Sequence, residues 1–304
     1  MVTKRSEKDM STIARTNVDK VFDTINVIIL SLVLVIILYP LIFVASASIS
    51  DPIRVLQGEV WLLPKGLNLE SYKLVFSHDK IMTGYRNTLF YTILGTLINL
   101  VMTTLGAYPL SRRDFRARSF FTLLFTFTMF FSGGMIPTYL VVKQLGLLDT
   151  IWAILLPGAV SVWNMTIMRN FFQTSIPFEL QESAMIDGCG NLSLLLKIVL
   201  PLSVPIIAVM IIFYGVGHWN SYFSALIYLT NQNKYPLQLV LRSILMKEET
   251  SEIIAADDSV IRRQMMAEIL KYAAIIVSSV PVLLLYPFLQ KYFVHGIMVG
   301  ALKG

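Results

Sequence analysis

Six stretches of the chain are long and apolar enough to cross a membrane, and this feature restricts the possible folds most strongly. A helix needs about 20 apolar residues to span the roughly 30 Å of hydrocarbon in a bilayer. The stretches are Thr24–Ala47, Thr88–Leu110, Ser119–Val141, Thr150–Met168, Val199–Tyr228 and Tyr272–Leu289. None of them contains Asp, Glu, Lys or Arg. Because backbone groups in lipid must be hydrogen-bonded within the protein, we predict an all-α polytopic membrane protein with six transmembrane helices.

The composition supports this class. Of the 304 residues, 55% are hydrophobic and 14% are charged, and the mean hydropathy is +0.67. Such values are typical of membrane proteins. The net charge of +6 does not predict a nucleic-acid partner, because the basic residues flank apolar runs and form no stripe with aromatic residues. The single cysteine, Cys189, forms no internal disulfide, and no Cys/His spacing predicts a metal.

Basic residues in the short loops predict the orientation. The loop between the second and third stretches carries Arg112, Arg113, Arg116 and Arg118, and several Lys and Arg residues precede the first stretch. Such positions face the cytoplasm by the positive-inside rule. We therefore expect residues 1–23 and 294–304 to be cytoplasmic segments around a six-helix transmembrane domain at 24–293.

Two longer connections are then external, at about 48–86 and 231–270. The first contains turn signals at Asp51-Pro52, Pro64-Lys65-Gly66 and Asn68, followed by a possible short helix at Glu70–Phe76. In the second, Ile253–Leu270 has the pattern of an amphipathic helix, although a solvated connector fits equally well.

A compact polar passage, residues 175–201, joins the fourth and fifth stretches. Ser175 is a candidate N-cap and Pro177 suits the first turn of a helix. Gly188 and Gly190 then end that helix, and Asn191 can cap a second one through Lys197. The passage is predicted to form a short helix, a tight turn and another short helix in the cytoplasm.

The predicted first helix has features of a protein-binding surface. Ala184 and Gly188 lie four residues apart and keep one face low, while Glu182 and Asp187 offer carboxylates to basic groups of a partner. From these features alone, an ordinary interfacial helix is an equally good interpretation.

The residue pattern adds a resemblance. Glu182-x-Ala184-x-x-Asp187-Gly188, followed by Ile198-x-Leu200-Pro201, resembles the EAA loop of permease subunits in ATP-binding-cassette (ABC) importers. Ser183 and Cys189 replace two small residues that are usually alanine. Both substitutes are also small.

The resemblance covers most of the chain. The six spans, the prolines after the loop and Trp219-Asn220-Ser221-Tyr222 are similar to maltose-type carbohydrate permeases, specifically the MalG-like subunit. The ending Lys291–Gly304 resembles the LplC/YtcP-like subgroup, which is associated with complex oligosaccharides.

This family implies a set of partners in a bacterial cell membrane: a second related permease subunit, two ABC ATPases, an external solute-binding protein and an oligosaccharide. The family also implies that the loop docks in a cleft of the ATPase, through Glu182, Ser183, Ala184, Asp187, Gly188, Leu200 and Pro201. ATP and Mg would be bound by the ATPases, because this chain has no G-x-x-x-x-G-K-[ST] loop. The chain is accordingly expected to be a transport subunit that binds no cofactor and is no enzyme. The tail from Gly296 to Gly304 would reach along the ATPase dimer.

Aromatic and uncharged polar residues in the spans are the candidates for the substrate pathway. They are Asn99, Trp163, Asn164, Tyr214, Trp219, Asn220 and Tyr222, with His218 as a possible pH-sensitive group. The alternative is structural, because Asn often bonds neighbouring membrane helices and Trp or Tyr often anchors a span end. In this family the partner subunit makes most sugar contacts, and residues 231–270 approach the binding protein.

Two other functions remain as alternatives. An ABC permease for a non-sugar solute would carry the same loop. An ion-coupled secondary transporter is disfavoured, because the spans hold no carboxylate or basic side chain and no inverted repeat is apparent. The positive charge only weakly suggests acidic oligosaccharides such as uronides.

Overall fold

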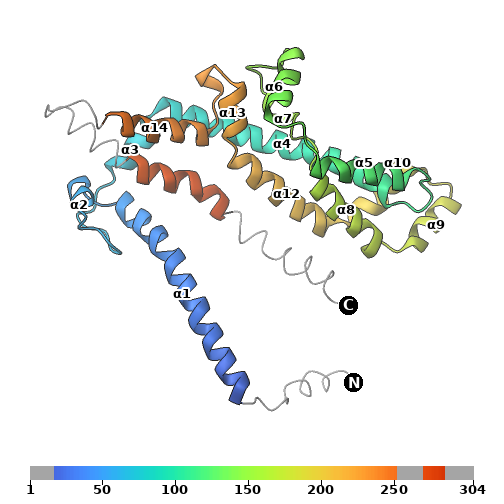
Figure 1. The fold of residues 1–304 in the computed structure, drawn as a ribbon, viewed down its shortest axis with the longest axis horizontal. Coiled ribbons are helices and arrows are strands. Elements are labelled where there is room, and N and C mark those ends of the chain that lie inside the picture. The colour runs from blue at the N-terminus through green and yellow to red at the C-terminus, as the bar shows by residue number, and fades with distance from the viewer. Residues whose placement is uncertain (1–16, 252–269, 285–304) are drawn as a thin grey trace. The chain divides into compact units, whose positions relative to one another are not determined.

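The computed structural model describes residues 17–251 and 270–284, and all regular elements within these ranges are helices (Figure 1). The chain divides into two units, Met1–Ser71 and Tyr72–Gly304. The predicted amphipathic helix at Ile253–Leu270 and the C-terminal tail lie outside the described residues, apart from Leu270 itself.

The first unit contains α1 (Asn17–Ser48) and α2 (Pro52–Leu56). At Asp51-Pro52, where a turn was predicted, a short helix begins instead: the Asp51 side chain accepts a bond from the Ile53 amide at 2.9 Å, with Pro52 in the first turn. Gly66 has a φ of 68°, which suits its place in the predicted turn. Asn68 Oδ1 accepts from the Glu70 amide at 2.7 Å, where the next helix begins.

Helix α3 (Glu70–Ser77) confirms the predicted short helix, and α4 (Asp79–Ser111) follows at once. The second predicted span, Thr88–Leu110, lies within α4, which begins earlier, at Asp79. Asp79, Lys80 and Arg86 lie in the first turns of α4. A charge-free criterion finds only the part of a helix that suits hydrocarbon, whereas the helix itself extends beyond it.

The third predicted span is bent. Helices α5 (Arg118–Phe130) and α6 (Met135–Gln144) meet at 112°, with Gly134 at a φ of 81° in the break. Only glycine adopts this conformation without strain.

The fourth predicted span, Thr150–Met168, is interrupted. Its residues belong to α7 (Trp152–Leu155) and α8 (Val162–Ser175). The side chain of Ser161 caps α8 by accepting from the Asn164 amide at 3.3 Å, so a new helix starts inside the apolar run. Continuous apolar sequence did not reveal this break.

The C-terminal half begins with α9 (Phe178–Ile186) and α10 (Asn191–Leu194), followed by a π-helix, η1 (Leu195–Val199), and α11 (Leu200–Leu202). The chain then bends by 83° into α12 (Val204–Trp219). The remaining described elements are α13 (Phe223–Tyr228), the 3-10 turn η2 (Gln232–Lys234), α14 (Leu237–Ser251) and a helix at Leu270–Leu284.

The part of the chain that the structure describes contains fewer long continuous helices than the six predicted spans. Among the described residues, α1 and α4 are long and apolar enough to cross a membrane, and the count rises to four if each bent pair is one span. The helix Leu270–Leu284 is apolar but shorter. The count of six therefore stays a prediction.

Helix α4 is the centre of the second unit. It packs against α12 and α8, and nearer its beginning against α14 (Figure 1). The main core lies between α4, α8 and α12, where Met168, Phe172 and Met210 are almost completely buried.

Candidate functional site

Helix α9, in the polar passage, has two different faces. The side chains of Gln181 and Ala184 are 8% and 9% exposed and face the rest of the chain. Glu182 and Ser183 are exposed, and Ile186 is 86% exposed on the same side. Within the described part of the chain, no ion pair joins Glu182 to another side chain. The outer face thus offers an unpaired carboxylate beside an apolar side chain.

The turn after α9 is fixed by Gly188, as predicted. Its φ is 79°, and its amide donates to the Met185 carbonyl at 3.0 Å. The Cys189 amide donates to the Ala184 carbonyl at 2.9 Å. These two bonds form a Schellman motif, which closes a helix with a left-handed residue.

Four local predictions in this passage were wrong. Ser175 is the last residue of α8, and Pro177 occupies the N-cap of α9 without a side-chain bond. Asn191 begins α10, whose N-cap is Gly190. Ala184 does not lower an outer face, because it packs into the main core. Tertiary packing decides which face of so short a helix turns inward.

The guanidinium of Arg112 contacts the inward-facing side of α9. Arg112 Nε and Nη2 donate to the two carboxylate oxygens of Asp114 at 2.9 and 2.8 Å. Nη1 donates to Gln181 Oε1 at 3.1 Å, and Nη2 lies 3.1 Å from Met185 Sδ. The hydrogen bonds from Arg112 hold the pKa of Asp114 below its usual value, and those to Asp114 raise the pKa of Arg112. Gln181 and Met185 are one turn apart on α9, so the Arg112 guanidinium contacts two successive turns of that helix.

This role of Arg112 was missed by the sequence analysis, which counted it among four arginines that set topology. Its side chain is only 5% exposed, whereas that of Asp114 is 57% exposed. The acid two residues later was the available signal, because a neighbouring carboxylate can neutralise a buried arginine.

Further contacts join α4 and its following loop to the passage. The Arg113 guanidinium lies 4.9 Å from the centre of the Phe178 ring, and the Tyr108 hydroxyl donates to the Asn191 carbonyl at 3.3 Å. From α8, Arg169 Nε donates to the Leu110 carbonyl at 3.1 Å. That bond satisfies one of the carbonyls that the end of a helix leaves open.

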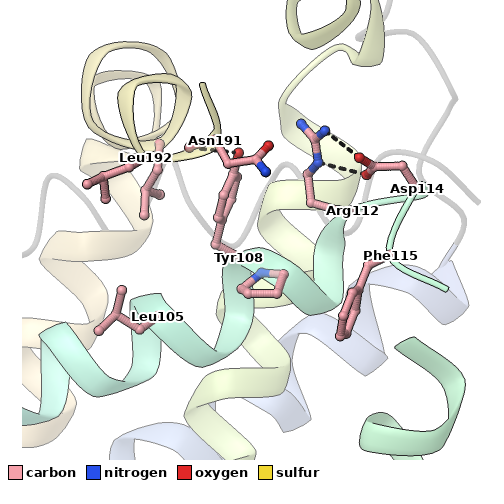
Figure 2. A pocket seen from close by; sticks show the side chains of 9 residues that line it. Leu105, Tyr108, Arg112, Asp114, Phe115, Asn191 and Leu192 are labelled. Carbon is pink, nitrogen blue, oxygen red and sulfur yellow. Dashed lines mark hydrogen bonds and ion pairs between the residues drawn. The ribbon is translucent and has the colours of Figure 1, made fainter. Parts of the chain in front are cut away.

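A pocket of about 360 Å³ lies beside these contacts, between the last turns of α4, the loop that follows and α10 (Figure 2). Leu105 and Leu192 line its apolar part, while Tyr108, Arg112 and Asp114 line its polar part. Figure 2 shows the two Arg112–Asp114 bonds at its edge.

The end of the pattern leads into α12. Leu200 is half-buried against the main core, and Pro201 is exposed. At the bend, the Ser203 hydroxyl donates to the Val199 carbonyl at 2.6 Å.

Four of the predicted substrate-pathway residues are buried between helices. Asn99 is 1% exposed; its Nδ2 donates to the carbonyls of Gly158 and Ala159 at 2.7 and 2.9 Å, and its Oδ1 lies 2.6 Å from His218 Nε2. The Tyr214 hydroxyl is 2.6 Å from Thr103 Oγ1. The other two, Asn164 and Trp219, are 8% and 5% exposed, and the Trp219 Nε1 donates to the Ser278 carbonyl at 3.0 Å. These contacts match the structural alternative.

The other three candidates are exposed. Trp163 is 64% exposed in the first turn of α8, and Asn220, at the C-cap of α12, donates to the Val216 carbonyl of that helix. Tyr222 is 40% exposed, and the Arg242 guanidinium lies 5.7 Å from its ring centre. Arg242 was not among the predicted residues.

A second polar cluster fixes residues 230–237. Asp149 Oδ1 accepts from the Thr230 and Asn231 amides at 3.0 Å each, and Lys234 Nζ lies 2.9 Å from Oδ2. The Asn231 amide, the Lys234 ammonium and the Thr230 amide together lower the pKa of Asp149 to about 2. From α4, the Tyr91 hydroxyl donates to the Lys234 carbonyl at 2.8 Å.

Comparison with known proteins agrees with the loop pattern, although no family model matches the chain. The chain is 40% identical to Protein LplC of Bacillus subtilis (strain 168), over 97% of this chain and 99% of that one. It is 41% identical to the polygalacturonan/rhamnogalacturonan transport system permease protein YtcP of the same organism, over 94% and 99%.

A solved structure has the same fold. One chain of a bacterial ABC transporter involved in the import of the acidic polysaccharide alginate matches with a TM-score of 0.83 and 34% identity, over 92% of this chain and 99% of that one. With relatives this similar over nearly their whole length, the chain belongs to the family of membrane-embedded permease subunits of carbohydrate ABC importers.

Proposed function

We propose that this permease forms half of an alternating-access path for oligosaccharides, paired with a second related permease subunit. Two partner ATPases bind ATP and Mg and drive the path, and an external solute-binding protein delivers the sugar. The family supports each of these partners in general terms.

Helix α9 is the coupling helix in this proposal. The observation that carries it is the division of α9 into a face anchored on Arg112 and a face with an unpaired Glu182 beside Ile186. Glu182 pairs with a basic group of the ATPase, and Ser183, Ile186 and Asp187 complete the contact. Gly188 sets the turn, while Ala184 and Leu200 support the helix from within. Pro201 marks the exposed end of the loop.

The proposed orientation puts α9, both termini and the loop after α4 in the cytoplasm. Four arginines in that loop support it by the positive-inside rule. In this orientation residues 230–237 lie on the external side. The bonds of Asp149 fix these residues at the start of the external connection 231–270, which contacts the binding protein in this proposal.

The proposed cargo is an oligosaccharide with acidic units, such as uronides. The substrates named for the two relatives YtcP and the alginate transporter support this class. Tyr222 and Arg242 add support, because an exposed aromatic face with a guanidinium over it suits a sugar ring with a carboxylate. Within the described residues, no carboxylate forms an ion pair with Arg242.

The test is reconstitution of the whole transporter in lipid, with ATPase activity measured against binding protein loaded with uronide or neutral oligosaccharides. Uronides should stimulate the ATPase most, and Arg242→Met should weaken that response more than the response to neutral sugars. Stimulation by no sugar would reject the carbohydrate assignment.

The coupling role has its own test. Glu182→Lys reverses the charge on the outer face and should abolish stimulation or release the ATPase, as judged by co-purification. Glu179→Lys is the matched control, since Glu179 also lies exposed on α9 but outside the family's loop pattern. Normal transport by the Glu182→Lys transporter would contradict the proposal.

A further inference from the structure

We propose that Arg112 is a positioning residue that joins α9 to the end of α4, so that a movement of α9 is passed directly to α4. The inference rests on the proposed function, because it takes α9 as the helix that the ATPase moves. It adds a residue outside the family's loop pattern, in a different part of the sequence.

Arg112, Asp114 and Gln181 form a connection between the end of α4 and α9, called the joint below. Arg112 is the residue directly after α4, and its amide donates to the Pro109 carbonyl at 3.1 Å, so its base is fixed on that helix. The planar guanidinium then meets Asp114 with two parallel bonds. A fork of this kind fixes direction as well as distance. The nitrogen that remains, Nη1, is thereby aimed at Gln181 of α9.

Burial distinguishes this arginine from the others in its loop. A charge that only sets topology can act from water, yet Arg112 is 5% exposed. Burying a charge is costly unless it is paired and hydrogen-bonded, and Arg112 is both. Arg116, four residues later, is exposed and has no ion pair with a described residue.

The bond from Arg112 Nη1 to Gln181 Oε1 is a charge-assisted hydrogen bond between the end of α4 and α9. Bonds with a charged partner are about twice as strong as neutral ones. The ring contact of Arg113 and the bond from Tyr108 at 3.3 Å are weaker supports. On the side of α10, the pocket in Figure 2 lies next to Arg112. Ala184 of α9 and Leu194 of α10 pack into the main core with α4, so Arg112 adds a directional polar anchor to an apolar contact.

The first test compares Arg112→Met with Arg116→Met in the whole reconstituted transporter. Each variant removes one positive charge from the same loop, so an effect on topology would be equal. The readout is the amount of oligosaccharide imported per ATP hydrolysed. Loss of charge-assisted bonds should reduce this ratio by about tenfold or more for Arg112→Met. Arg116→Met should match the wild type, and equal ratios for the two variants would overturn the joint.

A second pair of variants serves if Arg112→Met fails to assemble. Gln181→Glu keeps an acceptor for Nη1 and should preserve the ratio, whereas Gln181→Met has similar length without an acceptor and should lower it. Equal ratios for these two variants would also overturn the inference. If Glu182→Lys transports normally, the proposed function fails; if Glu182→Lys is inactive but Gln181→Met is normal, only the joint fails.

Discussion

At the scale of residues, two turns in this chain each depend on a single residue with a positive φ. Gly188 has a φ of 79°, and Asp149 has a φ of 55° although it is not glycine. Gly188 closes α9 through its backbone, while Asp149 uses its carboxylate to bind two amides and a lysine. At both positions the backbone conformation matters as well as the bonds that the residue makes. A substitution that changes one of these and keeps the other therefore tests each separately.

Gly188→Ala should loosen the turn after α9. A side chain in the left-handed region costs about 1–2 kcal/mol, so ATPase binding that needs this turn should weaken by about 5- to 30-fold. Gly190→Ala is the control, because Gly190 has a φ of −71° and an added Cβ meets no atom within 4 Å. Co-purification of the ATPase measures the effect. Equal binding by both variants would show that the turn does not matter.

Asp149→Asn should lower thermal stability in a pH-dependent way. Asn tolerates the same φ and keeps an acceptor, so the change removes mainly the charge. The folded pKa of about 2 lies below the unfolded value, so the carboxylate stabilises the protein above about pH 4. That advantage is lost as the pH falls toward 2.

Thermal unfolding in detergent between pH 2 and pH 7 checks this. The wild type should unfold at a higher temperature than Asp149→Asn above about pH 4, and the difference should shrink at lower pH. A difference that stays constant down to pH 2 would contradict the assignment.

At the scale of elements, α4 and α12 pack closely where Gly95 of α4 lies opposite His218 of α12. A Cβ added to Gly95 of α4 would lie 2.5 Å from His218 Nε2 of α12. The imidazole cannot move away freely, because it lies 2.6 Å from Asn99 Oδ1. Asn99 in turn binds two carbonyls in the break between α7 and α8. This network joins three parts of the fold.

Gly95→Ala should therefore destabilise the protein by about 1–3 kcal/mol, the usual cost of overpacking. Gly217→Ala in α12 is the control, because its added Cβ meets nothing within 4 Å. Thermal unfolding of the purified subunit in detergent compares the two. Equal stability of both variants would mean that His218 can give way, and the network would then be weaker than its distances indicate.

At the scale of the molecule, α4 connects the two polar clusters of its unit. A helix of 33 residues is about 50 Å long. In its first half, Tyr91 binds the segment that Asp149 fixes, and directly after its end, Arg112 binds α9. A continuous helix with these two anchors can pass a displacement from one cluster to the other.

The C-terminal tail gives a prediction at this scale. Family resemblance, rather than the described structure, suggests that the tail from Gly296 to Gly304 contacts the ATPases. Truncation after Val294 should lower ATPase stimulation in the reconstituted transporter while the spans still insert. Unchanged uptake by a truncated chain that assembles would remove this role.

Much of the class could be predicted from local sequence. Apolar runs without charge indicate membrane helices, because lipid cannot satisfy polar groups, and the spacing from Glu182 to Pro201 indicated the family. The turn at Gly188 was also predictable, since its conformation depends on the residue itself.

Tertiary structure decided how these pieces are used. The apolar run at Thr150–Met168 does not reveal its break at Ser161, because hydropathy is the same on both sides. The four arginines after α4 look alike in sequence, yet only the fold places Arg112 under Gln181. The inward turn of Ala184 and the pairing of Asn99 with His218 likewise depend on residues far away in the chain. Sequence alone determined which segments are apolar enough to enter a membrane and which family the loop pattern resembles, because both depend on local residue types. Tertiary structure decided which polar and small side chains are buried and paired, because their partners lie far away in the chain.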